Sequence, residues 1–310
     1  MIEKRQVLLF GATGNMGGAT ARALLERGWS VRAVTRKPRS VKAQALAALG
    51  AEVVQADMDD PPSLAAAFDG IRHVFSVQNF YKSGIEAEVR QGLAVADAAA
   101  AAGVAHIVYG SAGTGEAGTG VPHFDSKLEV EAHMRRLDLP LTIVRPTPFM
   151  ELLADMQFGP PLITWGAEPR VLGWHRPKPW IAVRDIGIAV ANIFANRDRW
   201  VGREVDLAGD VKTLAECRAI FKEVDGRKPL RIPLPFWILR RMGAEELLVM
   251  WEWLAELSDA MGRKGLWQMV EETRELCPDL LEVESWLRRL RAGRLEMAPL
   301  HPSAPAPAEG

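Results

Sequence analysis

The 310-residue chain has little cysteine, only Cys217 and Cys277, which lie far apart in the sequence. Two cysteines cannot build a disulfide framework and neither lies at a metal-ligand spacing, so the sequence predicts no metal site and a reducing compartment. The chain also lacks an uninterrupted apolar run of about 18 residues, the length that crosses a membrane. The apolar run at residues 7–10 is too short for a signal peptide, and we therefore expect a soluble, cytoplasmic protein.

An excess of charge of one sign is lacking as well. The chain contains 38 lysines and arginines against 39 aspartates and glutamates, which gives a formal net charge of -1. Binding to nucleic acid or to an anionic membrane needs a concentrated positive field. Four arginines between residues 288 and 294 are typical of the solvated face of a late helix. The sequence therefore predicts neither a nucleic-acid nor a membrane partner.

The first half of the chain alternates short apolar runs with stretches rich in alanine and leucine. Strands are expected at residues 7–10, 30–35, 52–55, 73–77, 106–109 and 141–144. Helices are expected at residues 17–27, 41–49, 62–68, 85–102 and 125–137. This alternation predicts an α/β fold, a Rossmann-like doubly wound parallel sheet with helices on both faces. Ligands of such sheets bind at the carboxyl ends of the strands.

The composition changes after about residue 150, where proline and tryptophan become frequent. We expect residues 1–150 to form the dinucleotide-binding core, completed by a return strand near 203–208. Residues 151–294 should form a smaller, mainly helical C-terminal lobe for a substrate or a partner. Residues 245–261 carry more apolar side chains than one helix face needs, which indicates either a core helix or a surface for a homodimer or protein partner. The proline-rich tail, 295–310, is predicted to be disordered.

A glycine-rich loop lies between the first expected strand and the first expected helix. Gly11 permits a tight turn, Gly14 lets the backbone approach a diphosphate, and Gly17 lets the helix pack closely on the strand. The backbone amides of Asn15 and Met16 would face the anion at the helix N-terminus. In a complete βαβ series, this loop predicts a dinucleotide site.

The ends of the second and third expected strands indicate which dinucleotide binds. An NAD site uses an acidic residue after the second strand, whereas this chain has Arg36 and Lys37, which suit a 2′-phosphate. We therefore expect NADP(H), the alternative being a cationic surface loop. Asp57 could accept a hydrogen bond from the adenine amino group while Met58 packs on the ring, or Asp57 could belong only to the start of the next helix.

These runs, at residues 11–18, 31–38 and 51–57, together with residues 123–127 and 145–150, resemble the NmrA-like family of atypical short-chain dehydrogenases. The resemblance covers roughly residues 5–215. It implies an NADP(H)-binding Rossmann fold with a small substrate lobe, and further cofactor contacts from Thr13, Gln78 and Pro146. The family includes reductases of quinones and dyes, plant reductases of aromatic alcohols and ethers, and proteins thought to sense the NADPH/NADP+ ratio through protein partners.

The resemblance also implies where catalytic residues would lie. The usual short-chain dehydrogenase site combines Ser, Tyr and Lys; Ser111 and Lys127 match the serine and lysine, but His123 occupies the tyrosine position. His123 could donate a proton or only line the pocket. Ser111 could bind a substrate carbonyl or form a turn. Tyr81, in the loop after the fourth strand, is a second candidate proton donor.

The substrate is harder to predict than the cofactor. His123 and three aromatic residues, Phe149, Trp165 and Trp174, could line a pocket for a flat apolar molecule, although the aromatic residues could equally form the core of the lobe. We expect an NADPH-dependent reductase of an aromatic or quinone-like small molecule, with Lys127 holding the nicotinamide ribose. The alternative is a non-catalytic redox sensor that acts through a protein partner, which the missing tyrosine favours.

Overall fold

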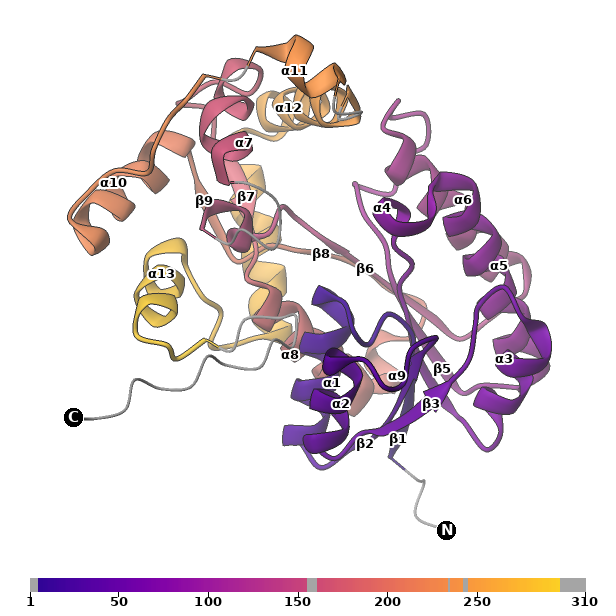
Figure 1. Cartoon of the computed structure of the whole chain (residues 1–310). Helices are drawn as coiled ribbons and strands as arrows, with labels where there is room; N and C mark the ends of the chain where they lie inside the picture. Colours follow the sequence, from indigo (N-terminus) through magenta and orange to yellow (C-terminus); the bar gives the residue numbers. More distant parts are fainter. Residues whose placement is uncertain (1–4, 155–160, 234, 242–244, 296–310) are drawn as a thin grey trace, which may run out of the picture.

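A seven-stranded parallel sheet forms the centre of the protein (Figure 1). The computed structural model describes residues 5–154, 161–233, 235–241 and 245–295, and the tail predicted from residue 295 lies almost wholly outside them. The strand order is β3-β2-β1-β4-β5-β6-β8. The strands are β1 (Gln6–Leu9), β2 (Ser30–Thr35), β3 (Glu52–Gln55), β4 (His73–Ser76), β5 (His106–Gly110), β6 (Leu141–Pro146) and β8 (Glu204–Leu207). The order reverses beside β1, which confirms the predicted Rossmann-like fold and sets the ligand edge there.

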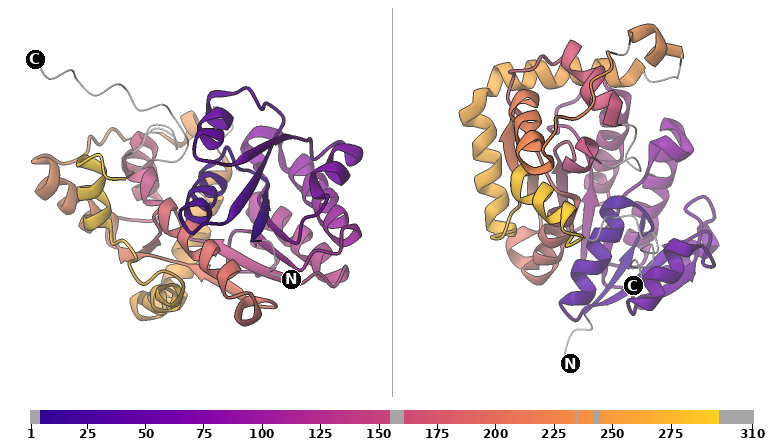
Figure 2. Two further views of the ribbon diagram at one scale, coloured as in Figure 1. Left: turned by 90° about the horizontal axis from the view of Figure 1, so that it is seen from below. Right: turned by 60° about the vertical axis from the view of Figure 1, so that its left-hand side comes forward.

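The central strands read as continuous apolar runs because helices cover both faces of the sheet (Figure 2). Every residue of β1 and of β4 is buried. One face carries α1 (Asn15–Glu26), α2 (Val41–Ala48), α8 (Val183–Ala195) and α9 (Arg197–Trp200). The other face carries α3 (Pro61–Phe68), α5 (Ile85–Ala101) and α6 (Pro122–Arg136), and the short α4 (Phe80–Ser83) precedes α5.

Two helices of the core begin two or three residues earlier than the sequence predicts. Helix α1 starts at Asn15 rather than at residue 17, because the extended Gly14 serves as its N-cap. Helix α6 starts at Pro122 rather than at residue 125, with Val121 as the N-cap. Proline fits the first turn of a helix, where its missing N–H costs no hydrogen bond. Both starts lie at the ligand edge of the sheet, so residues 15 and 123 are helical residues there.

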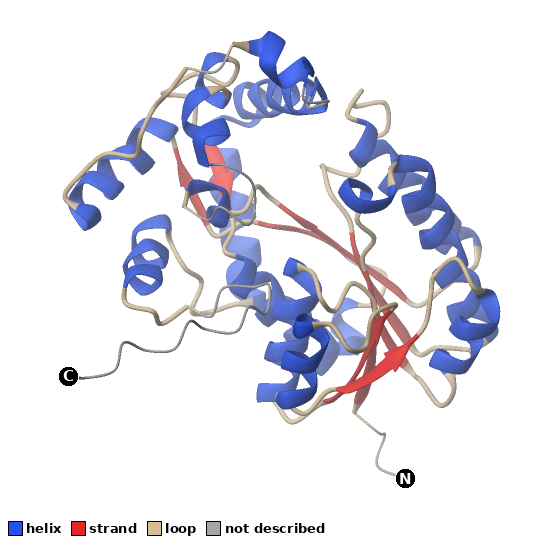
Figure 3. Ribbon diagram, in the orientation of Figure 1, coloured by secondary structure: helices blue, strands red, loops and turns tan. Residues whose placement is uncertain are grey.

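The C-terminal lobe is mainly helical (Figure 3). Its elements are η1 (Met150–Leu153), α7 (Pro161–Gly166), η3 (Glu168–Arg170), the antiparallel pair β7 (Lys178–Trp180) and β9 (Asp210–Lys212), α10 (Leu214–Asp225), α11 (Phe236–Arg241), α12 (Glu245–Leu276) and α13 (Val283–Arg291). Its core contains three fully buried tryptophans, Trp165, Trp180 and Trp286. The return strand expected near 203–208 is β8, which pairs with β6 in the sheet.

Helix α12 joins the lobe to the sheet. It is interrupted at Gly262, where φ is +60°, and it packs against α8, β7, β8 and β9. Its first half buries Leu248, Trp251 and Leu254 in the lobe core, so of the two alternatives for residues 245–261 the core helix fits the structure. No helix in the described part of the chain is long and apolar enough to span a bilayer.

Candidate functional site at the carboxyl edge of the sheet

The glycine-rich loop is packed so closely that side chains are excluded at two positions. Gly11 has φ of +69°, which favours glycine, and a Cβ there would lie 2.6 Å from Val77 Cγ1. A Cβ on Gly17 would lie 2.2 Å from the carbonyl oxygen of Gly11. The loop is therefore pressed against the first turn of α1, whose free backbone N–H groups form the kind of cradle that binds phosphate.

The two residues that open α1 differ in what they can offer a ligand. Asn15 is half-buried at the first helical position, next to the half-buried Thr13 and Gly14. The Met16 side chain is 9% exposed and packs beneath the loop, with its methyl carbon 3.0 Å from where a Cβ of Gly110 would lie. Met16 can therefore contribute its backbone amide, and Asn15 both its amide and its side chain.

An open pocket with a volume of about 390 Å³ lies at the ends of β2 and β3. Its lining residues are Arg36, Gln55, Ala56, Asp57, Asp60 and Ser63. Arg36 is exposed and forms no salt bridge within the described part of the chain, although its charge helps to lower the pKa of Asp59; the neighbouring Lys37 is also exposed. The pocket therefore holds a guanidinium that no salt bridge fixes, at the carboxyl ends of β2 and β3.

Asp57 takes part in the turn that starts α3. Its carboxylate accepts a hydrogen bond from the Asp59 backbone N–H at 3.1 Å, and Asp60 is the N-cap of the helix. One carboxylate oxygen of Asp57 is thus engaged in local structure, while the residue still lines the pocket. Met58 is half-buried, and its sulfur lies 3.7 Å from the side-chain nitrogen of Gln78.

Lys127 forms a buried ion pair that joins α6 to α5. Its Nζ donates to Glu88 Oε1 at 2.9 Å and to the Gln78 carbonyl at 3.4 Å. The other oxygen of Glu88 accepts from Ser126 Oγ at 2.6 Å, and Glu88 is completely buried. A buried ammonium keeps its charge when it has a paired carboxylate. One of its three N–H donors has no partner among the described residues.

His123 is enclosed by aromatic rings and by α12. Its ring stacks on Phe80 with centroids 4.6 Å apart and an angle of 8° between the planes, and it meets Phe124 edge-on at 4.5 Å. Its Nδ1 donates to the carboxylate of Glu246, at the start of α12. Burial lowers the pKa of His123, although the charge and hydrogen bond of Glu246 raise it in part. Burial thus favours the unprotonated imidazole, while the contact with Glu246 favours a proton on Nδ1.

Ser111 contacts a buried charged cluster instead of an open site. Its hydroxyl donates to Glu131, which also accepts two hydrogen bonds from Arg145, at 2.7 and 3.3 Å. Arg145 continues to Glu204 at 2.7 Å, so the cluster ties α6 to β6 and β8. A substrate carbonyl would have to compete with Glu131 for the hydroxyl proton, which favours the structural alternative for Ser111.

The remaining candidates of the core lie around the same edge. Tyr81 is 72% exposed, and its ring centroid is 3.8 Å from that of Phe80. Gln78 is buried and donates to Ser76 Oγ at 2.9 Å, while its side-chain oxygen has no partner among the described residues. Pro146 is half-buried at the end of β6. Lys127, His123, Tyr81 and Gln78 thus come from neighbouring segments after β4 and at the start of α6.

The three aromatic pocket candidates are separated by the structure. Phe149 is half-buried and packs on Ala19 and Val183 beside α1. Trp165 is 1% exposed and donates its indole N–H to the Leu153 carbonyl at 3.0 Å, so it belongs to the lobe core and does not line a pocket. Trp174 lines a second pocket on the lobe, against α10 and away from the sheet edge. Of the three, only Phe149 lies beside the core helices.

Two functional candidates, Glu88 and Glu246, were not singled out from the sequence. A signal existed for Glu88, because it falls on the helix face that carries Gly92, Val95 and Ala99, all buried. No local signal existed for Glu246, whose partner is 123 residues away in the chain. Glu88 pairs with Lys127, and Glu246 contacts His123, the residue at the position of the usual short-chain dehydrogenase tyrosine.

Comparison with known proteins shows which family this chain resembles. The family model described as the NmrA-like family matches residues 3–287. The NmrA-like family domain-containing oxidoreductase FrzB of Cladobotryum sp is 31% identical over 261 residues, which cover 74% of this chain and 77% of the relative.

Solved structures show the same fold. NmrA, a negative transcriptional regulator, matches with a TM-score of 0.74 and 22% identity over 95% of this chain and 99% of that chain. Triphenylmethane reductase of Citrobacter sp., complexed with NADP(H), gives 0.68 and 21%, covering 92% and 98%. The NADPH-dependent quinone oxidoreductase QOR2 of Escherichia coli gives 0.69 and 23%, covering 92% and 99%. With the family match spanning nearly the whole chain, these findings confirm the resemblance: this protein belongs to the NmrA-like family.

Proposed function

We propose that the chain binds NADP(H), with the diphosphate at the glycine-rich loop and the 2′-phosphate at Arg36. The observation that carries this proposal is the open pocket at the end of β2, where Arg36 is exposed and forms no salt bridge within the described residues. Gly17 approaches the Gly11 carbonyl so closely that no side chain fits between them, which leaves the backbone N–H groups at the start of α1 open to a diphosphate. NmrA was crystallised with NADP and also with NAD, so the phosphate preference of this chain rests on its own residues.

The substitution Arg36→Ala tests the phosphate site. A charged hydrogen-bonding partner of a phosphate contributes about 1.5–3 kcal/mol, so the dissociation constant for NADPH should rise about 10- to 100-fold. Binding of NADH, which lacks the phosphate, is the internal control and should change little. Calorimetric titration measures both, and an equal loss for the two cofactors would remove Arg36 from the phosphate site.

We propose further that the protein reduces an apolar aromatic or quinone-like acceptor. When bound, NADPH supplies the hydride. The paired ammonium of Lys127, with one N–H free of partners among the described residues, suits the hydroxyls of the nicotinamide ribose. Curated relatives named as oxidoreductases, together with a dye reductase and a quinone oxidoreductase among the structural neighbours, support this activity.

The environment of His123 narrows the choice of acceptor. Burial of His123 disfavours its protonated form and Glu246 engages its Nδ1, which makes it a poor proton donor, and its stacking on Phe80 suits a wall of the site. The site therefore favours acceptors that need no proton from the enzyme. A quinone can take its proton from water after hydride transfer, and a cationic dye becomes neutral on accepting the hydride and needs none. Ketones that need an enzymatic proton donor fit this site poorly.

Turnover of NADPH with a panel of quinones and triphenylmethane dyes tests the activity. Lys127→Ala should lower kcat at least about tenfold, because it removes the group that orients the ribose. Lys222→Ala, on an exposed position of α10, is the matched control and should leave kcat unchanged. Thermal melting of both variants separates a loss of chemistry from a loss of folding.

A redox sensor is the second candidate function, favoured by the histidine in place of the usual tyrosine. NmrA, a structural neighbour, is described as a negative transcriptional regulator. A sensor should bind NADPH and NADP+ with different affinities, oxidise none of the acceptors, and retain a protein partner in one redox state only. Tight NADPH binding without any turnover across the acceptor panel would favour this function over the reductase.

A further inference from the structure

A second pocket lies on the C-terminal lobe, lined by residues that the cofactor site does not use. Its volume is about 250 Å³, and the lining residues are Trp174, His175, Ala215, Arg218, Ala219, Lys228 and Arg231. Trp174 and His175 precede β7, the alanines and Arg218 share one face of α10, and the two other cations follow α10. None of them belongs to the parallel sheet or to the helices that cover it.

The charges around this pocket are all of one sign. Arg218, Lys228 and Arg231 have no carboxylate partner within the part of the chain that the structure describes. The acidic residues of α10 are engaged elsewhere, in the pairs Glu216–Arg263, Glu223–Arg288 and Asp225–Arg291. In a chain with a net charge of -1, three uncompensated cations around one cavity form a local positive site.

The tryptophan arranges two of these cations. The guanidinium carbon of Arg231 lies 4.9 Å from the centre of a Trp174 ring, and that of Arg218 lies 5.7 Å from it. The Nε of Arg218 is buried without a hydrogen-bond partner in the described residues. Arg218 is thus a pocket-lining cation with no protein acceptor at its Nε within the described residues.

The walls and size of the pocket indicate the kind of ligand. Ala215 and Ala219 leave room beside the indole, and the half-buried Trp174 offers an aromatic surface. Drug-sized ligands occupy about 300–1,000 Å³, so the smaller volume here suits a single ring with one attached group. Arginine binds carboxylate and phosphate oxygens and also stacks on planar rings.

We propose that this pocket binds a small aromatic anion, with its carboxylate or phosphate held by Arg218, Lys228 and Arg231 and its ring against Trp174. The site is separate from the proposed NADP(H) site and does not depend on it. The two anionic groups share the same chemistry at the guanidinium groups, so the probes must distinguish them. Binding should also weaken as salt rises, because two of the three cations are exposed.

Calorimetric titration of the full chain with benzoate, phenyl phosphate and inorganic phosphate tests the proposal. At least one aryl anion should bind saturably at low millimolar concentration or below, and more tightly than inorganic phosphate. Arg231→Ala, on an exposed segment, should weaken binding at least about tenfold, whereas Arg240→Ala on α11, outside the pocket, should not. Trp174→Leu should weaken the aryl anions more than inorganic phosphate, because it removes the aromatic surface as well as the ring on which Arg218 and Arg231 lie.

Several outcomes would overturn the proposal. They are the absence of saturable binding by either aryl anion, affinities unchanged by Arg231→Ala, and competition with NADPH for one site. Inorganic phosphate that binds as tightly as the aryl anions would refute the role of Trp174. Arg218→Ala is a second variant of the anion site and should also weaken binding of the aryl anions. Circular dichroism checks that Arg231→Ala and Arg218→Ala remain folded.

Discussion

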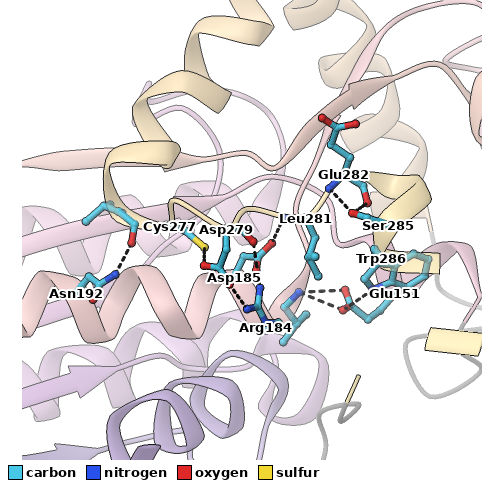
Figure 4. Close-up of polar contacts among 12 residues, drawn as sticks. Glu151, Arg184, Asp185, Asn192, Cys277, Asp279, Leu281, Glu282, Ser285 and Trp286 are labelled. Carbon is cyan, nitrogen blue, oxygen red and sulfur yellow. Dashed lines mark hydrogen bonds and ion pairs between the residues drawn. The ribbon is translucent and has the colours of Figure 1, made fainter. Parts of the chain in front are cut away.

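Glu151 is a buried carboxyl that lies beside Trp286 (Figure 4). Its ionisation should weaken the folded protein. It is 5% exposed in η1, and it accepts hydrogen bonds from the Val183 N–H at 3.1 Å and from the Trp286 indole N–H at 3.3 Å. Burial raises the pKa of Glu151 from 4.5 to about 7, and its hydrogen bonds offset only part of that rise. The carboxyl thus sits where η1, the start of α8 and α13 meet.

The size of the effect follows from the pKa difference. The folded chain holds the proton more tightly than the unfolded chain, so the unfavourable contribution is absent below pH 4.5, grows between 4.5 and 7, and is complete above 7. At about 1.4 kcal/mol per pH unit, the free energy of unfolding should fall by about 3 kcal/mol through this residue. Stability due to Glu151 is therefore lost as the pH rises.

Glu151→Gln removes the ionisation and keeps one oxygen to accept from the N–H groups of Val183 and Trp286. Chemical denaturation at pH 4.5 and pH 8 measures the difference in unfolding free energy between variant and wild type. That difference should shift by about 3 kcal/mol in favour of the variant between the two pH values. Glu129→Gln, at an exposed position on α6, is the control for loss of a surface carboxylate. A difference for Glu151→Gln that does not change with pH would refute the reasoning.

Three further substitutions test the site. Gly17→Ala forces a methyl group against the Gly11 carbonyl, so it should abolish NADPH binding and cost about 1–3 kcal/mol of stability. The control Gly28→Ala, at the other end of α1, should leave NADPH binding intact. Equal NADPH affinity of the two variants would contradict diphosphate binding at the glycine-rich loop. Glu88→Gln leaves the Lys127 ammonium without its carboxylate and should cost about 3–5 kcal/mol in chemical denaturation, so a cost below 1 kcal/mol would argue against the pair. Glu246→Gln removes interactions that raise the pKa of His123 and should lower its titration midpoint in NMR, and an unchanged midpoint would exclude the contact.

The core of the fold is predictable because its signals are local. The apolar runs of β1 and β4 are buried on both faces, and the close approach of Gly17 to Gly11 lies within seven residues of chain. The contact of Gly11 with Val77 is long-range, but the glycine spacing of the loop already indicates it. The helix starts were predicted late because the apolar pattern of α1 and α6 begins after their first turns, whereas the caps at Gly14 and Val121 set the boundaries. The apolar periodicity thus predicts where helices and strands lie, whereas the capping residues determine where the helices begin.

The site was predictable only in part, because its charged contacts are long-range. Arg36 is a candidate because of its place after a strand, a local signal, whereas the carboxylates that hold Lys127 and His123 come from α5 and α12. Trp165 and Trp174 look alike in the sequence, yet the first is a core residue and the second lines a surface pocket, a difference set by packing against η1 and α10. Such placements depend on how the C-terminal lobe docks on the sheet.

The proposed reductase requires that the hydride leave one face of a nicotinamide held at the sheet edge. Turnover of NADPH labelled with deuterium at either C4 position, with a quinone acceptor, measures this directly. The proposal predicts that NADP+ loses deuterium from one isotopomer and retains it from the other, and that the transferring isotopomer reacts more slowly. Loss of deuterium from both faces alike, or no oxidation by a protein that binds NADPH, would contradict it.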